Sequence, residues 1–148
     1  MIIQSPEIRV LFSLIGKFGV DVNLDKITKE MCIKPTKTRT PDDWPEAIKN
    51  PKTELSDEFR PHYVWQIDIG YESDKFVRDR FGIMLRLLTK KIGIINNLKN
   101  QFSLRASFTI GIHAQHDQHN MPEVFLTQEI VTFAASIGAD IGFDMYLD

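Results

Sequence analysis

The sequence predicts an α+β domain with a mainly antiparallel or mixed sheet of four to five strands and helices packed on one face. Four stretches alternate apolar with polar residues, which is typical of strands that bury one face. Three further stretches carry apolar residues at helical spacing. Because the strands are apolar on one side only, we expect the other side of the sheet to be partly open to water.

The first strand and the first helix lie in residues 8–33. The strand alternates strictly, and its inward positions are Ile8, Val10, Phe12 and Leu14. Asn23 is a suitable N-cap for the helix, which carries Ile27 and Met31 inward. The helix is expected to stop at Lys34, because the residue before a proline is pushed out of the helical region.

Residues 34–61 form a long loop that contains five prolines. Loops of this length without secondary structure are uncommon and are often functional. We expect a short edge strand inside this loop, near residues 36–40.

The second half of the chain continues with alternating strands and helices. Residues 63–71 and 102–112 alternate, so each is expected to form a strand. Between them, Ser73 is the expected cap of one long helix that ends at Gly93. The last helix is expected to begin at Thr127 and to end at Gly138.

The final strand covers residues 141–147. Ile141, Phe143 and Met145 are expected to anchor it in the core, while Asp140, Asp144 and Asp148 share the opposite face. With the short edge strand included, residues 8–113 have the order βαββαβ. This order predicts a ferredoxin-like core that is extended by one helix and one strand.

Length and composition indicate one globular domain over residues 1–148. Apolar residues make up 43% of the chain and charged residues 26%. No apolar run approaches the about 18 residues that a membrane span needs, and the single cysteine excludes an internal disulfide. We therefore expect a cytoplasmic protein that has no contact with a membrane.

Charge is distributed unevenly along the chain. Residues 1–105 contain all 18 lysines and arginines and 14 acidic residues, a formal charge of +4. Residues 106–148 contain six acidic residues and no lysine or arginine. Such asymmetry can steer a charged partner, although an acidic solvated face without a function is the alternative.

Three histidines near the end of the fourth predicted strand form the clearest candidate site. His113, His116 and His119 are suitable zinc ligands, together with Asp117 between them. A helix or a strand would direct side chains at this spacing apart, so only a loop could bring them together. The two hypotheses are a zinc site and a polar turn that is rich in histidine, and we expect no other cofactor.

Trp44 lies in an acidic part of the long loop. Its acidic neighbours are Asp42, Asp43 and Glu46. A tryptophan in this setting could anchor a protein interface, because tryptophans are enriched at hot spots. The alternative is that Trp44 folds back as a lid over the core.

The remaining chemically interesting residues are expected to be structural. Cys32 lies between apolar residues at a helix end, so we expect a buried thiol rather than a nucleophile. The long helix carries the basic residues Lys75, Arg78, Arg80, Arg86, Lys90 and Lys91. Acidic residues interrupt this row and no stacking aromatics accompany it, which indicates a solvated face and argues against nucleic-acid binding.

Three stretches of the chain resemble a known bacterial family. They are Ile27 with Met31-Cys32-Ile33-Lys34-Pro35-Thr36, then Trp65-Gln66-Ile67 with Leu85, Leu87 and Leu88, and the ending Ile137-Gly138-Ala139-Asp140-Ile141-Gly142-Phe143-Asp144-Met145-Tyr146. Their order and spacing are similar to domain-of-unknown-function family 4279. Family members often carry a Lys-Gly pair after Pro-Thr, and this chain lacks that glycine. The resemblance implies no catalytic residue, but it implies a context, because such domains occur as candidate immunity proteins beside bacterial toxins.

We therefore expect a protein-binding domain without enzymatic activity. The sequence contains no glycine-rich phosphate-binding motif, no nucleophile-elbow motif and no zinc-protease motif. The expected function is that of an immunity protein that binds and neutralises a bacterial toxin. We expect this toxin to be a nuclease, because an acidic surface would attract the basic active site of a nuclease. The predicted partner-binding residues are Asp42, Asp43, Trp44, Glu46, Asp140, Asp144 and Asp148. One alternative is a metal-binding enzyme or metal sensor that uses residues 113–119, and another is a homodimeric module that closes an exposed sheet edge.

Overall fold

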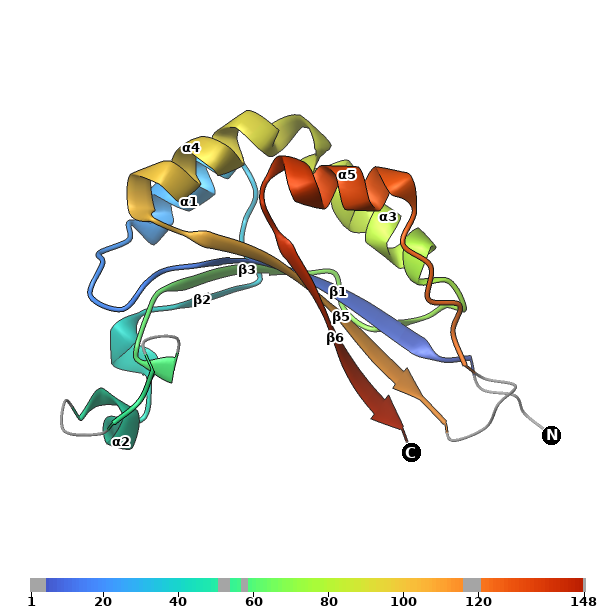
Figure 1. Cartoon of the computed structure of the whole chain (residues 1–148), viewed down its shortest axis with the longest axis horizontal. Coiled ribbons are helices and arrows are strands. Elements are labelled where there is room, and N and C mark those ends of the chain that lie inside the picture. The colour runs from blue at the N-terminus through green and yellow to red at the C-terminus, as the bar shows by residue number, and fades with distance from the viewer. Residues whose placement is uncertain (1–4, 51–53, 57–58, 116–120, 148) are drawn as a thin grey trace.

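The computed structural model describes residues 5–50, 54–56, 59–115 and 121–147, and it consists of one mixed sheet with helices packed on one face (Figure 1). The strands are β1 (Glu7–Ile15), β2 (Lys37–Arg39), β3 (Val64–Asp68), β4 (Glu72–Ser73), β5 (Arg105–Ala114) and β6 (Asp140–Leu147). The helices are α1 (Leu24–Met31), α2 (Glu46–Lys49), α3 (Val77–Leu88), α4 (Ile92–Phe102) and α5 (Gln128–Ser136), with 3-10 turns η1 (Pro41–Asp43) and η3 (Thr89–Lys91). The predicted α+β class is confirmed.

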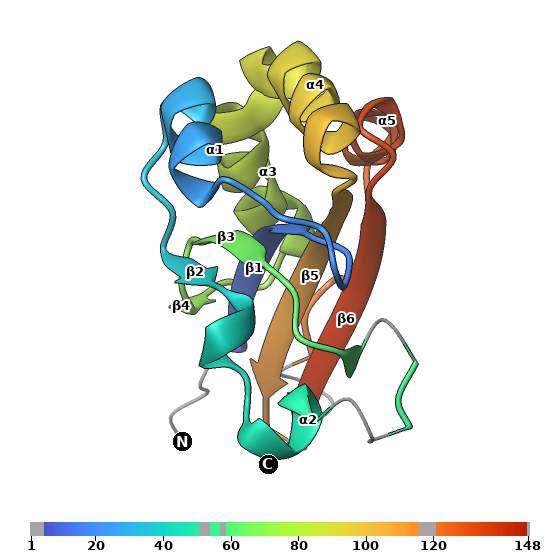
Figure 2. The ribbon, with the colours of Figure 1, turned by 90° about the vertical axis from the view of Figure 1, so that its left-hand side faces the viewer.

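The strand order of the sheet is β2-β3-β1-β5-β6, and the short β4 pairs with β1. All neighbours are antiparallel except β5 and β6, which are parallel. The βαββαβ order predicted for a ferredoxin-like core is confirmed, and so is the short edge strand near residues 36–40. β6 follows α5 and extends the sheet beyond β5, so that β2 and β6 lie at opposite edges (Figure 2).

The core lies between the sheet and the helices. Phe12 of β1 pairs with Phe108 of β5, and both side chains are completely buried. The ring centroid of Phe108 lies 5.2 Å from that of Phe12, 4.8 Å from that of Phe81 on α3 and 6.3 Å from that of Phe133 on α5. Phe108 therefore joins the centre of the sheet to two of the helices that cover it.

Two predicted helix caps are confirmed. The side chain of Asn23 accepts a hydrogen bond of 3.0 Å from the backbone N–H of Lys26, at the start of α1. The hydroxyl of Thr127 accepts one of 3.2 Å from the N–H of Ile130, at the start of α5. Both side chains satisfy backbone donors that have no partner inside the helix.

The predicted helix from Ser73 to Gly93 is wrong at both ends. Ser73 lies in β4, and α3 begins only after Phe76. Gly93 lies in the first turn of α4, which continues to Phe102 and ends at Ser103 in the left-handed conformation, with φ of 54°. A glycine marks a helix end only where the chain leaves the helix. Here the chain continues from α3 through the short 3-10 turn η3 into α4, so Gly93 lies inside a second helix.

The predicted strand 63–71 is shorter than its alternation suggests. β3 ends at Asp68, and Gly70 takes a φ of +80°, which turns the chain before β4. The carboxylate of Asp68 accepts a hydrogen bond of 2.7 Å from the N–H of Gly70 and stabilises this turn.

Arg80 and Cys32 differ from expectation in opposite ways. Arg80 is only 4% exposed, so the prediction of a solvated side chain is wrong for it. Its guanidinium donates to the backbone oxygens of Ile8 and Gly70 at 3.3 and 2.9 Å, which ties α3 to β1 and to the turn before β4.

Cys32 is exposed rather than buried, because Met31 takes the last inward position of α1 and Cys32 leaves the helix in the left-handed conformation.

Helices that could cross a membrane are absent from the described part of the chain, since none combines the required length with the required apolar character.

Candidate functional site

One face of the sheet lies opposite the main helices (Figure 1), and most of the positions that the register assigns to it are small or polar. Because residues paired across neighbouring strands point to the same side, the register assigns the positions of this open face. From β3 across to β6, they include Gln66, Asp68, Leu11, Ser13, Ser107, Thr109, Gly111, Gly142 and Asp144. Several of the positions on β5 and β6 carry short side chains, and the Tyr71 hydroxyl lies over one of them, Gly111.

A cluster of charged and aromatic side chains lies on the open face. Arg9 of β1 forms an ion pair of 3.1 Å with Asp68 of β3, and its guanidinium lies 5.3 Å from the ring centroid of Tyr71. The hydroxyl of Tyr71 lies over Gly111, where a Cβ atom would come within 2.7 Å of it. Sequence analysis missed this cluster, although a glycine inside a strongly alternating strand was a usable signal of close approach.

β6 exposes the apolar side chains that were expected to anchor it. Phe143 is 42% exposed and Met145 is 48% exposed, so the prediction that they reach the core is wrong. Only Ile141 is partly buried against the core cluster. The reason is the position of the strand, because β6 is the last strand of the sheet and runs out from beneath α5 (Figure 1).

Asp140 and Asp144 lie on the open face of β6. The register places Asp140 beside Ser107 and Asp144 beside Gly111. Asp140 lies 3.6 Å from Arg105, with side chains that are 69% and 59% exposed, so solvent weakens this ion pair. Asp148, the third predicted acidic residue of this group, lies outside the described residues.

The acidic residues of the long loop do not have equivalent roles. Asp43 caps its own turn, and its carboxylate accepts a hydrogen bond of 2.7 Å from the backbone N–H of Thr40. This hydrogen bond holds the pKa of the Asp43 carboxyl below its ordinary value. Asp42 is exposed, and Glu46 is exposed with Lys49 at 3.3 Å.

Trp44 is partly buried beside β2. Its indole N–H donates a hydrogen bond of 3.0 Å to the backbone oxygen of His62, and the two rings lie 4.6 Å apart. The guanidinium of Arg39 lies 4.0 Å from the centroid of the Trp44 ring. Trp44 thus folds back on the domain, but it packs on His62 and Arg39 rather than over the buried core cluster.

The predicted partner-binding residues therefore form two groups. One group follows β2 and contains Asp42, Asp43, Trp44 and Glu46, and the other lies on β6 and contains Asp140 and Asp144. Since β2 and β6 are opposite edges of the sheet, the fold does not bring the two groups together into one site.

His113 lies within β5 rather than in a turn. Its Nδ1 atom is 4.0 Å from a carboxylate oxygen of Glu7. His113 and Glu7 line a hollow of about 370 Å³ together with Ser5 and Ser73. His116 and His119 lie outside the described residues, so the three-histidine zinc hypothesis stays a prediction. Within the described residues, no three His, Cys, Asp or Glu side chains are grouped closely enough to hold a metal ion.

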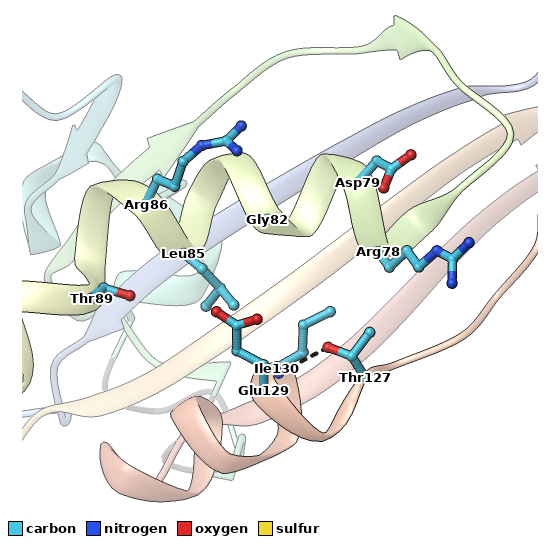
Figure 3. Close-up of a pocket in the computed structure, with 9 residues that line it drawn as sticks. All are labelled: Arg78, Asp79, Gly82, Leu85, Arg86, Thr89, Thr127, Glu129 and Ile130. Atoms are coloured by element: carbon cyan, nitrogen blue, oxygen red, sulfur yellow. Dashed lines mark hydrogen bonds between the residues drawn. The ribbon is translucent and has the colours of Figure 1, made fainter.

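Two further hollows lie elsewhere on the domain. One, of about 270 Å³, lies between α3 and α5, and Figure 3 shows Leu85 directed toward Glu129 and Ile130 while Arg86 points away from α5. Its lining carries charges of both signs, from Arg78, Arg86, Asp79 and Glu129. The other, of about 460 Å³, is lined by Ile15, Phe18, Val20, His62 and Arg105, among others.

Comparison with known proteins finds one family. The family model described as "Domain of unknown function (DUF4279)" matches residues 6–148. No curated protein and no solved structure matches the chain.

Proposed function

The chain belongs to domain-of-unknown-function family 4279, and we propose that it is a protein-binding domain that acts as an immunity protein against a bacterial toxin. The observation that carries this proposal is the acidic strand β6 at the edge of an open sheet face. The expected toxin is a nuclease, because a nuclease presents basic residues where it binds nucleic acid.

The open face has the properties of a docking surface. Over β5 and β6 its central positions are the small residues Ser107, Thr109, Gly111 and Gly142, and the aromatic side chain of Tyr71 lies over Gly111. Its outer edge adds Tyr146, which is 57% exposed, and aromatic residues are enriched in protein interfaces. A partner with a convex surface could therefore reach both the sheet and the aromatic edge.

Charge gives the surface its preference for a basic partner. Asp144 is exposed and has no neighbouring lysine or arginine along its own strand, and the chain contains no lysine or arginine after Arg105. Opposite charges on two surfaces raise the rate of association and select the correct orientation. The inhibitory complex of this proposal would therefore form quickly and depend strongly on salt.

The test uses the reading frames that flank the gene in its genome. Each is expressed in a host with and without this chain, and we expect one of them to stop growth unless the chain is present. For that pair, stopped-flow measurements should show that Asp144→Lys slows association about tenfold at low ionic strength. Both measurements are made at protein concentrations low enough to keep the variant monomeric, and there the free energy of unfolding should change little, because Asp144 is exposed.

Glu129→Lys is the matched control. It changes the charge by the same amount, but Glu129 lies on α5, on the helix side of the sheet. If both variants slow association equally, only net charge matters and the open face is not the docking surface. If no flanking product is neutralised by the chain, the immunity function itself is contradicted.

A further inference from the structure

The outer edge of β6 offers a row of backbone hydrogen-bonding groups. β6 spans eight residues and pairs with β5 on one side, and no strand of the described part of the chain pairs with its other side. In such an edge strand, alternate N–H and C=O groups point outward and can be satisfied by an added strand. Figures 1 and 2 show β6 running along the margin of the sheet.

The apolar side chains of β6 lack the cover that their neighbours have. Phe143 lies beside Ile110 and Met145 beside Ile112 in the parallel register. Ile110 and Ile112 are fully buried, whereas Phe143 and Met145 are 42% and 48% exposed. A strand added outside β6 would place its own side chains next to Phe143 and Met145, and would remove apolar surface from water.

The acidic residues of β6 disfavour a second copy of this chain as the added strand. An antiparallel pair of β6 strands centred on Gly142 would place Asp140 opposite Asp144 twice, and a pair centred on Asp144 would place the two Asp144 residues together. A pair centred on Phe143 would leave these carboxylates as diagonal neighbours. Like charges directly opposite each other destabilise strand pairing.

The same pattern favours a segment with basic and apolar residues in alternation. We propose that β6 binds an extended segment of the toxin as an additional strand, with basic residues opposite Asp140 and Asp144 and apolar residues opposite Phe143 and Met145. Backbone hydrogen bonds give this mode of recognition its affinity, and the alternating side chains give it specificity. The inference rests on the proposed function, for which it names the binding mode.

The probe for this edge is a synthetic peptide with blocked ends in which lysine and valine alternate. The control is the same peptide with glutamate in place of lysine. We expect the lysine peptide to bind about tenfold more tightly and to slow hydrogen exchange at alternate backbone amides of β6. Equal affinities of the two peptides would overturn the inference. Slower hydrogen exchange at residues of the open face, without slower exchange along β6, would overturn it as well.

The chain itself provides a second test that needs no ligand. In the Asp144→Lys variant, an antiparallel pair of β6 strands centred on Gly142 would place the introduced lysine of each copy opposite Asp140 of the other copy. Sedimentation velocity should show a monomer for the unmodified chain, a dimer for Asp144→Lys, and a monomer again when Asp140→Lys is added. If the unmodified chain already dimerises through β6, or if Asp144→Lys stays monomeric at high protein concentration, the edge does not behave as proposed.

The two proposals can fail separately. Neutralisation of a toxin without protection of the β6 amides would contradict strand addition and leave the immunity function in place. Binding of the lysine peptide at β6, when no flanking product is neutralised, would support the edge as a strand acceptor and contradict the immunity function.

Discussion

β5 and β6 have the same alternation of residues and lie side by side, yet one is buried and the other is exposed. Phe108 and Ile110 of β5 are fully buried, whereas Phe143 and Leu147 of β6 are 42% and 50% exposed. β5 has a neighbour on each side and helices above it, whereas β6 has a neighbour on one side only. Alternation therefore identifies a strand and its two faces, but it does not reveal how many neighbours the strand has.

The largest expected effect comes from truncating one phenylalanine in each strand. Phe108→Ala should lower the free energy of unfolding by about 3–5 kcal/mol, because it leaves a cavity among Phe12, Phe81 and Phe133. Phe143→Ala should cost less than about 1 kcal/mol, because Phe143 is already partly in water. Urea denaturation measures both values, and similar losses would mean that β6 is covered in solution.

The same contrast between inward and outward positions applies to two arginines of α3. Arg80→Met should cost about 3 kcal/mol, because it leaves the carbonyl oxygens of Ile8 and Gly70 without their donor. Arg86→Met is the control, because Arg86 is exposed on the same helix, and it should change stability by no more than about 0.5 kcal/mol. A small effect of Arg80→Met would show that water replaces the guanidinium at these carbonyl groups.

Two glycines on the open face offer a finer comparison. Gly111→Ala should cost about 1–3 kcal/mol, because the added Cβ atom would come within 2.7 Å of the Tyr71 hydroxyl. Gly142→Ala on β6 meets no atom within 4 Å and should be neutral or slightly stabilising. Adding Tyr71→Phe to Gly111→Ala should restore part of the loss, and failure to do so would place the strain elsewhere.

Local patterns in the sequence were sufficient to predict most of the fold. Strict alternation identified the long strands β1, β3, β5 and β6, and the caps at Asn23 and Thr127 located two helix starts, because these signals depend on neighbouring residues only. The boundary between α3 and α4 could not be predicted, because a glycine has the same appearance inside a helix and just after one. The burial of Arg80 depends on carbonyl groups of a distant strand and a distant turn, which no local pattern reveals.

The candidate site was predicted only in part, for the same reason. The acidic character of residues 106–148 is a property of composition, and it was visible directly. The exposure of Phe143 and the separation of Asp144 from Asp42 follow from strand order, which a single sequence does not contain. The Tyr71–Gly111 contact also required the register of the sheet.

The smallest expected effect separates two carboxylates that the sequence analysis treated as equivalent. The backbone hydrogen bond from Thr40 lowers the pKa of Asp43, so the carboxylate form of Asp43 stabilises the folded state. That contribution is present above the unfolded pKa of about 3.9 and is lost as the pH falls through the lower pKa of the folded state. Asp43→Asn should therefore reduce stability slightly at neutral pH, and its difference from the unmodified chain should shrink on acidification.

Asp144→Asn should behave in the opposite way, with little change in stability at neutral pH, because the side chain is exposed, and slower association with a basic partner. Unfolding curves measured across the acidic range, together with association rates for both variants, test this assignment. If Asp43→Asn slowed association as much as Asp144→Asn, the segment between β2 and β3 would belong to the docking surface despite its position at the other edge of the sheet. The pair of variants thus decides whether a partner contacts one edge of the sheet or both.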